Sequence, residues 1–243
     1  MPHFPFQRLQ IDLAALIESL PPGSRLPSEP VLAKQLGVSR ATLREAMRMF
    51  EGQGLIRRRQ GAGTFVVGKP PVFEGGLEVL ESMLTLARRT GLDVGPGPVS
   101  IEQTFADAET AESLEVEPGA PLIRISRTMS ADSRPVAYLV DTLPAELLQP
   151  GELNNQFDGS VLDYLLSRGD PLTISYTNIS ASNATAEVAK MLEIQRGDVL
   201  LQFTARLFTA SGKVVDFSYS YFLPGYFKFH IVRRVGPPDS LKR

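Results

Sequence analysis

The spacing of apolar residues predicts three helices and a hairpin at the start of the chain. The opening helix has apolar positions at i, i+4, i+7, i+8 and i+11, namely Leu9, Leu13, Leu16, Ile17 and Leu20. Ser28 is the expected N-cap of a short second helix that ends at Gly37. Ser39 is the expected N-cap of a third helix, whose core stripe is Leu43, Ala46, Met47 and Phe50. Two β-prone runs around glycines then predict a hairpin that ends near Val67.

The third helix carries a second stripe, which is basic. Arg40, Arg44 and Arg48 recur every fourth residue and therefore line one outward side of the helix. Ala41 and Thr42 are small and lie near the start of the helix, which lets its first turns approach base edges in a DNA groove. The pattern favours a recognition helix.

The hairpin that follows is also basic. Arg57, Arg58 and Arg59 put charge on both faces of its first strand, and Gly61 and Gly63 form a tip that allows close approach to a phosphate. Any one of these arginines, taken alone, is better explained as a solvated surface charge. The ordered combination of helix, turn, arginine helix and basic hairpin favours DNA binding.

Charge and composition support a DNA-binding head on an acidic body. Residues 1–68 hold nine Lys and Arg against five Asp and Glu, a net of +4, whereas residues 69–243 have a net of −6. Cysteine is absent, which excludes disulfides and thiolate metal sites and fits a cytoplasmic protein. The sequence has two histidines and shows no membrane span, signal peptide, catalytic motif, metal-ligand spacing or cofactor motif.

The head resembles the winged helix-turn-helix domain of the GntR family of bacterial transcription regulators. The matching words are LPSE, LAKQLGVSRATLREA and GLIRRRQGAGTFV, and Pro30 and Gln60 depart from the family pattern. The resemblance and the arginine pattern together give the expected DNA contacts: Ser39, Arg40, Thr42, Arg44, Arg48, Arg58, Arg59, Gly61 and Gly63.

The body contains an internal duplication. With an offset of 78 residues, Ala111 pairs with Ala189, Leu114 with Leu192 and Gly119 with Gly197. Each copy predicts a short helix, a glycine turn and two long strands, and 161–168 predicts a helix between the copies. The expected fold class is α+β, with a winged helix-turn-helix domain, an internally duplicated and mostly antiparallel sheet, and helices. The expected boundaries are 1–68 for the DNA-binding domain, 69–97 for a linker that includes a helix at 77–90, 98–236 for the body and 237–243 for a tail.

The body resembles the UTRA effector-binding domain of the HutC branch of GntR regulators, which shares its fold with chorismate lyase. The repeats LEVEPGAPLIRISR and LEIQRGDVLLQF are characteristic of that domain. The resemblance implies an effector site formed by Arg127, Ser160, Asp216, Phe222, Ser82 and Met83. Of these, Arg127 matches a residue that holds the anionic group of the ligand. A surface ion pair for Arg127 and a helix cap for Ser160 are open alternatives, and the aromatic pattern around Phe222 favours strand packing over ligand stacking.

The functional expectation is a homodimeric repressor that reads a pseudo-palindromic operator and responds to a small anionic or polar metabolite. Met129 and Leu139 stand where the family often has polar residues, which makes the expected site less polar. Two alternatives stay open at this point. The chain could be an architectural DNA binder whose body only dimerises, or its body could be an enzyme of the chorismate-lyase type.

Overall fold

The computed structural model describes residues 5–59, 61–67, 73–90, 94–132, 134–148, 157 and 159–233. The departure from the family pattern at Gln60 and the tail expected at 237–243 lie outside these residues. No helix in the described ranges has both the length and the apolar character needed to cross a membrane.

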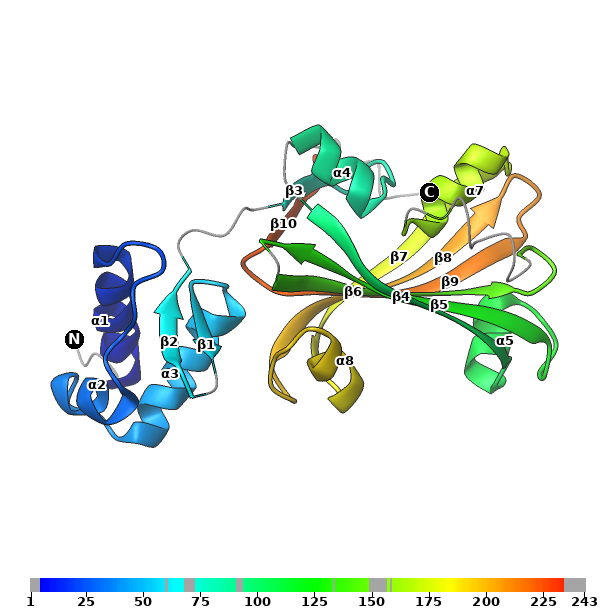
Figure 1. Ribbon diagram of the computed structural model, residues 1–243. Coiled ribbons are helices and arrows are strands. Elements are labelled where there is room, and N and C mark those ends of the chain that lie inside the picture. Colours follow the sequence, from blue (N-terminus) through cyan, green and yellow to red (C-terminus); the bar gives the residue numbers. More distant parts are fainter. Residues whose placement is uncertain are drawn as a thin grey trace, which may run out of the picture.

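The N-terminal domain is a winged helix-turn-helix, as predicted (Figure 1). Its elements are α1 (Pro5–Ser19), α2 (Glu29–Gln35), α3 (Arg40–Gly52), β1 (Ile56–Arg59) and β2 (Gly63–Val66). The predicted apolar stripes of the three helices meet in one core, in which Leu13, Leu32 and Leu43 are fully buried. The apolar residues that recur at helical spacing therefore form the core of this domain.

The body is built on one six-stranded antiparallel sheet with the strand order β4-β5-β6-β9-β8-β7. Its strands are β4 (Val94–Phe105), β5 (Pro121–Ala131), β6 (Arg134–Pro144), β7 (Leu172–Asn183), β8 (Val199–Thr209) and β9 (Val214–Phe222). Its helices are α4 (Met83–Thr90), α5 (Ala108–Leu114), α7 (Val161–Arg168) and α8 (Ala186–Met191). Figure 1 shows α4 and α7 on one side of the sheet and α5 and α8 on the other.

The duplication is visible in the backbone. Each copy consists of a strand, a helix and two strands, and β7 begins 78 residues after β4. Equivalent residues repeat the same turns: Glu115 and Glu193 both have left-handed backbones, with φ of 57° and 53°. The helix of each copy contacts a strand of the other copy, because Glu109 of α5 accepts a hydrogen bond from Tyr219 and Glu187 of α8 accepts one from Tyr138. The two copies thus share one sheet, as expected from the sequence.

The region expected to be a linker is partly a piece of the body. Its helix begins at Met83 and not at Leu77, because Ser82 caps it by accepting a hydrogen bond from the N–H of Thr85. Before it, β3 (Phe73–Gly76) pairs in parallel with β10 (Phe227–His230). Part of the region 69–97 therefore packs with the body.

Two strands, β4 and β7, were missed in the sequence. They are the edge strands of the sheet, and most of their side chains are exposed on both faces. Without one consistently buried face, neither shows the alternation on which strand prediction depends. Pro96, Gly97 and Pro98 also interrupt β4 at an irregularity in its pairing with β5.

Candidate DNA interface and ligand pocket

The exposed side of α3 presents the predicted basic stripe. Ser39 caps the helix by accepting a hydrogen bond from the N–H of Thr42, at 3.1 Å. Arg40, Arg44 and Arg48 are exposed, while the core stripe on the other side is buried. An α-helix fits into the major groove of DNA, and α3 would bring three guanidinium groups to the bases and phosphates there.

An acidic residue already pairs with the middle arginine of this stripe. Nε of Arg44 lies 2.6 Å from Oε2 of Glu29, at the start of α2, and the Arg44 side chain is 53% exposed. The hairpin adds Arg59, whose guanidinium lies 5.5 Å above the ring of Phe65, and the Gly61 tip, which faces open space. These groups stand on the same domain as the α3 stripe and extend its basic surface.

Arg58 is held more firmly within the protein than the other arginines that are expected to contact DNA. Its guanidinium turns inward between Glu51 and Glu29, with N–O distances of 3.7 and 4.0 Å. Its backbone N–H also donates to Glu51, at 3.0 Å. The side chain ties the hairpin to α3 and α2, so we do not include it in the basic surface.

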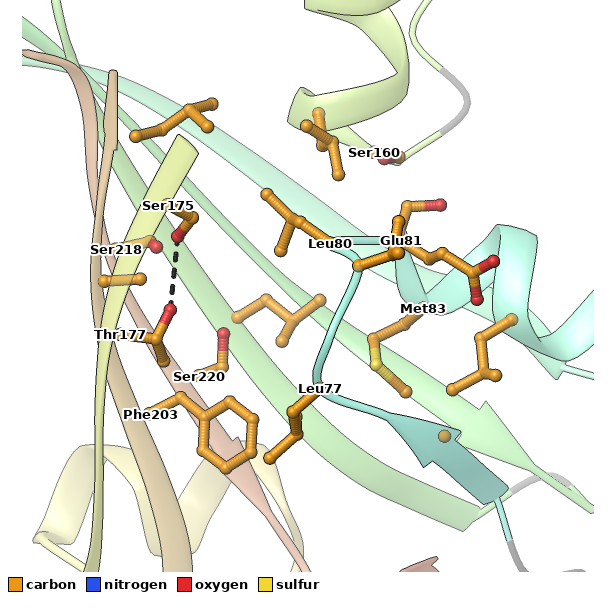
Figure 2. A pocket seen from close by; sticks show the side chains of 18 of the residues that line it. Leu77, Leu80, Glu81, Met83, Ser160, Ser175, Thr177, Phe203, Ser218 and Ser220 are labelled. Atoms are coloured by element: carbon orange, nitrogen blue, oxygen red, sulfur yellow. Dashed lines mark hydrogen bonds between the residues drawn. The ribbon is translucent and has the colours of Figure 1, made fainter. Parts of the chain in front are cut away.

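The body holds a pocket of about 740 Å³ between the sheet, α7 and the segment that leads into α4. Figure 2 shows Leu77, Leu80 and Met83 on one side of it, and Ser175, Thr177, Ser218 and Ser220 on the other. All six residues expected to bind an effector line this pocket. They are Ser82, Met83, Arg127, Ser160, Asp216 and Phe222. The tertiary structure brings together residues that lie far apart in the chain.

Three of these residues also have partners within the fold. Ser160 caps α7 by accepting a hydrogen bond from the N–H of Asp163, and Ser82 donates to the carboxylate of Asp163, at 2.5 Å. Phe222 is buried against Phe203 and Phe227, with ring centroids 5.1 and 4.7 Å away. Ser82 and Ser160 thus have structural partners in addition to their places in the pocket wall.

Arg127 forms an ion pair at the pocket floor that the sequence did not reveal. Its Nη1 donates to Oδ2 of Asp141 on the neighbouring strand, and both side chains are buried. Asp216 lies on the next strand, and burial together with the charge of Asp141 raises its pKa well above the ordinary value. Asp141 was missed because β5 and β6 come together only in the sheet, where Arg127 is opposite Leu139.

A buried joint, formed by Arg134 and Tyr226, connects the body to the end of α3. Arg134 donates to the backbone carbonyl of Glu51 at 3.1 Å and to the hydroxyl of Tyr226 at 3.3 Å. Gly54 and Gly225 allow this contact, since a Cβ on Gly54 would lie 2.4 Å from the Tyr226 ring and one on Gly225 would lie 2.4 Å from the carbonyl oxygen of Gln53. The joint is continuous with the aromatic wall of the pocket, because Tyr226 and Phe227 belong to the same buried cluster as Phe222.

Comparisons with known proteins decide the family. Residues 7–66 match the model of bacterial regulatory proteins of the gntR family, and residues 91–228 match the UTRA domain. The chain belongs to the GntR family of bacterial transcription regulators. It is a DNA-binding regulator with an effector-binding domain, and it is not an enzyme.

The regulator is similar over most of its length to characterised relatives. It is 30% identical to the HTH-type transcriptional repressor NagR of Bacillus subtilis, over 81% of this chain and 80% of NagR. It is 28% identical to the histidine utilization repressor of Pseudomonas putida, over 80% and 77% of the two chains. The crystal structure of PhnF from Mycobacterium smegmatis has the same fold, with a TM-score of 0.64 at 23% identity, and covers 94% of the regulator and 100% of PhnF.

Proposed function

We propose that this regulator is a homodimeric repressor that binds a pseudo-palindromic operator and responds to a small polar metabolite in the body pocket. Repression is supported by the names of the relatives, two of which are repressors. A two-fold symmetric dimer presents two recognition helices at a fixed spacing, which matches a DNA site with two related halves.

The DNA contacts would come from the α3 stripe and the wing. Ser39, Arg40, Thr42, Arg44 and Arg48 lie along the exposed side of α3 or at its cap. Arg59, Gly61 and Gly63 belong to the wing. Since the Arg44–Glu29 pair is exposed, water and counterions already weaken it, and Arg44 can exchange the carboxylate for a phosphate or a guanine edge at little cost.

The buried joint at Arg134 is the observation that carries the regulatory part of the proposal. A ligand that moves Phe222 or the strand β10 would also shift Tyr226, which contacts Gly54 directly after α3. Such a shift would change the position of the recognition helix relative to the body. A ligand acts as a switch only if it binds one placement of the head more tightly than the other.

Spin labels can test this coupling directly, because the chain has no cysteine to compete with the labelled sites. Ala15→Cys on α1 and Glu112→Cys on α5 place one exposed label on the head and one on the body. An operator selected from random DNA should change the measured distance distribution, and a metabolite that releases the DNA should reverse the change. Identical distance distributions in the free protein, with the operator, and with the operator and metabolite together would contradict the coupling.

The dimer has its own measurement. Sedimentation of the full chain with the selected operator should give two protein chains for each DNA duplex. A single chain on a DNA site without internal symmetry would contradict the dimer and leave the DNA contacts unaffected.

A further inference from the structure

The floor of the pocket contains one more acidic group than basic groups. Arg127 on β5, Asp141 on β6 and Asp216 on β9 come from three adjacent strands, and each is less than one-tenth exposed. Arg127 pairs with Asp141. Buried charges in proteins are paired, and Asp216 has no cation of its own among the described residues.

Two buried polar atoms at this floor lack a hydrogen-bond partner among the described residues: Nε of Arg127 and Oδ1 of Asp216. Asp216 receives a hydrogen bond from the backbone N–H of Thr142 and shares one with the side chain of Asp141, which still leaves Oδ1 without a partner among the described residues. An unsatisfied buried group costs about 1–3 kcal/mol. A ligand that donates to Oδ1 of Asp216 would recover this free energy.

The N-terminus of α7, where helix N–H groups favour an anion, already faces a carboxylate of the protein. Asp163 lies in the first turn of α7 and accepts hydrogen bonds from Ser82 at 2.5 Å and from Thr85 at 3.4 Å. Its negative charge would repel a phosphate or carboxylate that approached Ser160. Both places that could hold an anion, Arg127 and the start of α7, are therefore neutralised from within the protein.

The remaining wall supplies hydroxyl groups and further acids. The residues around the cavity include Glu78 and the serines and threonine labelled in Figure 2, together with Glu81, which is paired with Arg89 at 2.8 Å. Among the described residues that line the pocket, Arg127 is the single basic one. The potential inside the pocket consequently favours a cation over an anion.

We propose that the pocket binds a metabolite with a primary amine, whose ammonium group donates to Asp216, while Arg127 serves as the counterion of Asp141. The bound amine would complete a set of two carboxylates and two cations. The proposal rests on the proposed function only in taking this pocket as the effector site.

Amine binding would be linked to release of a proton. Burial and Asp141 raise the pKa of Asp216, which favours the protonated form of this carboxyl in the free protein, whereas an ammonium group favours the ionised form. The charged groups that face Asp216 are Asp141 from β6 and Arg127 from β5, and β8 contributes the apolar Leu207. Amine affinity should therefore rise with pH until Asp216 is ionised in the free protein, and should fall as pH decreases.

Three probes with the same carbon chain can test the charge preference: butane-1,4-diamine, butane-1,4-diol and succinate. We expect the diamine to raise the melting temperature of the full-length protein most, the diol less and succinate least, with a larger diamine effect at pH 8 than at pH 6. Calorimetry in two buffers of different ionisation enthalpy should show proton release with the diamine. Asp216→Asn should abolish the extra effect of the diamine, whereas Glu112→Gln on the exposed face of α5 should not.

Several outcomes would overturn the proposal. These are equal effects of the three probes, including no effect of any, a stronger effect of succinate that Arg127→Gln removes, or a diamine effect that Asp216→Asn leaves intact. Asp141→Asn gives an independent test, because it frees Arg127 and should bring succinate binding to the level of the diol or above.

Failure of this proposal and failure of the proposed function give different results. Selective amine binding that never alters operator binding would leave the ligand class in place and reject the coupling. A phosphate or carboxylate metabolite that binds in the pocket and releases the operator would support the coupling and reject the amine.

Discussion

The head and the body each contain an arginine paired with a carboxylate, but the two pairs have opposite physical character. The Arg44 side chain, on the recognition helix, is 53% exposed, whereas that of Arg127, on the pocket floor, is 7% exposed. An exposed pair contributes about 0–1 kcal/mol and exchanges partners readily. A buried pair cannot lose one member without leaving an uncompensated charge. Exposure therefore decides which arginine is available to a ligand.

The largest effect is expected for Arg127→Ala. Removing the guanidinium leaves the buried carboxylate of Asp141 without its cation, which should lower the free energy of unfolding by about 3–5 kcal/mol. Urea denaturation measures this change. Arg124→Ala is a matched control on the same strand, where the arginine contacts Glu187 on the other face and the cost should stay below about 1 kcal/mol. Equal costs for the two variants would remove the distinction between buried and exposed pairs.

Arg44→Ala should act on DNA affinity and hardly on stability. Loss of a base or phosphate contact from the recognition helix should weaken operator binding by about 1–3 kcal/mol, roughly 10- to 100-fold, and should lower its salt dependence. Fluorescence anisotropy over a range of salt concentrations measures both. Lys213→Ala removes a charge from a body hairpin and should leave operator binding unchanged. An Arg44 variant with normal affinity and salt dependence would exclude this arginine from the interface.

The joint tests whether the two regions communicate. Arg134→Ala removes hydrogen bonds to the Glu51 carbonyl and the Tyr226 hydroxyl, which for a charged donor contribute about 1.5–3 kcal/mol each. We expect a broader distribution of distances between the head and body labels and a smaller effect of the effector on DNA affinity. Arg134→Lys keeps the charge but loses the planar fork, so it should show most of the same effect. An unchanged distance distribution in both variants would mean that the joint does not hold the head.

The head was predictable because its elements form from local patterns. Leu9 to Leu20 lie on one stripe, Ser39 caps α3 as expected, and the glycines mark the hairpin tip. The duplicated sheet and the helix at 161–168 were also predictable, from a repeat at a fixed offset and an apolar run. Patterns of this kind depend on neighbouring residues, so a single sequence contains them.

The chemistry of the pocket was less accessible. The sequence located Arg127 and Asp216, but not Asp141, because the ion pair depends on strands β5, β6 and β9 lying side by side. Arg134 gave no signal at all, since its role arises from contact with Glu51, 83 residues earlier in the chain. Charges that pair across a sheet or between domains leave no regular spacing in the sequence, so the pairing of Arg127 with Asp141 had to come from the structure.

The smallest effect is expected at the exposed edge of the joint. Arg57 lies 3.5 Å from Glu193, and the two side chains are 33% and 62% exposed. Glu193→Gln keeps the side-chain length at this left-handed position. It should lower the free energy of unfolding by less than about 0.5 kcal/mol, an effect that vanishes at high salt, and it should leave the label distances unchanged. Chemical denaturation and label distances at low and high salt would measure it. If Glu193→Gln lowered the free energy of unfolding more than Arg134→Ala does, the exposed ion pair would stabilise the joint more than the buried hydrogen bonds. The comparison between buried and exposed pairs would then be reversed.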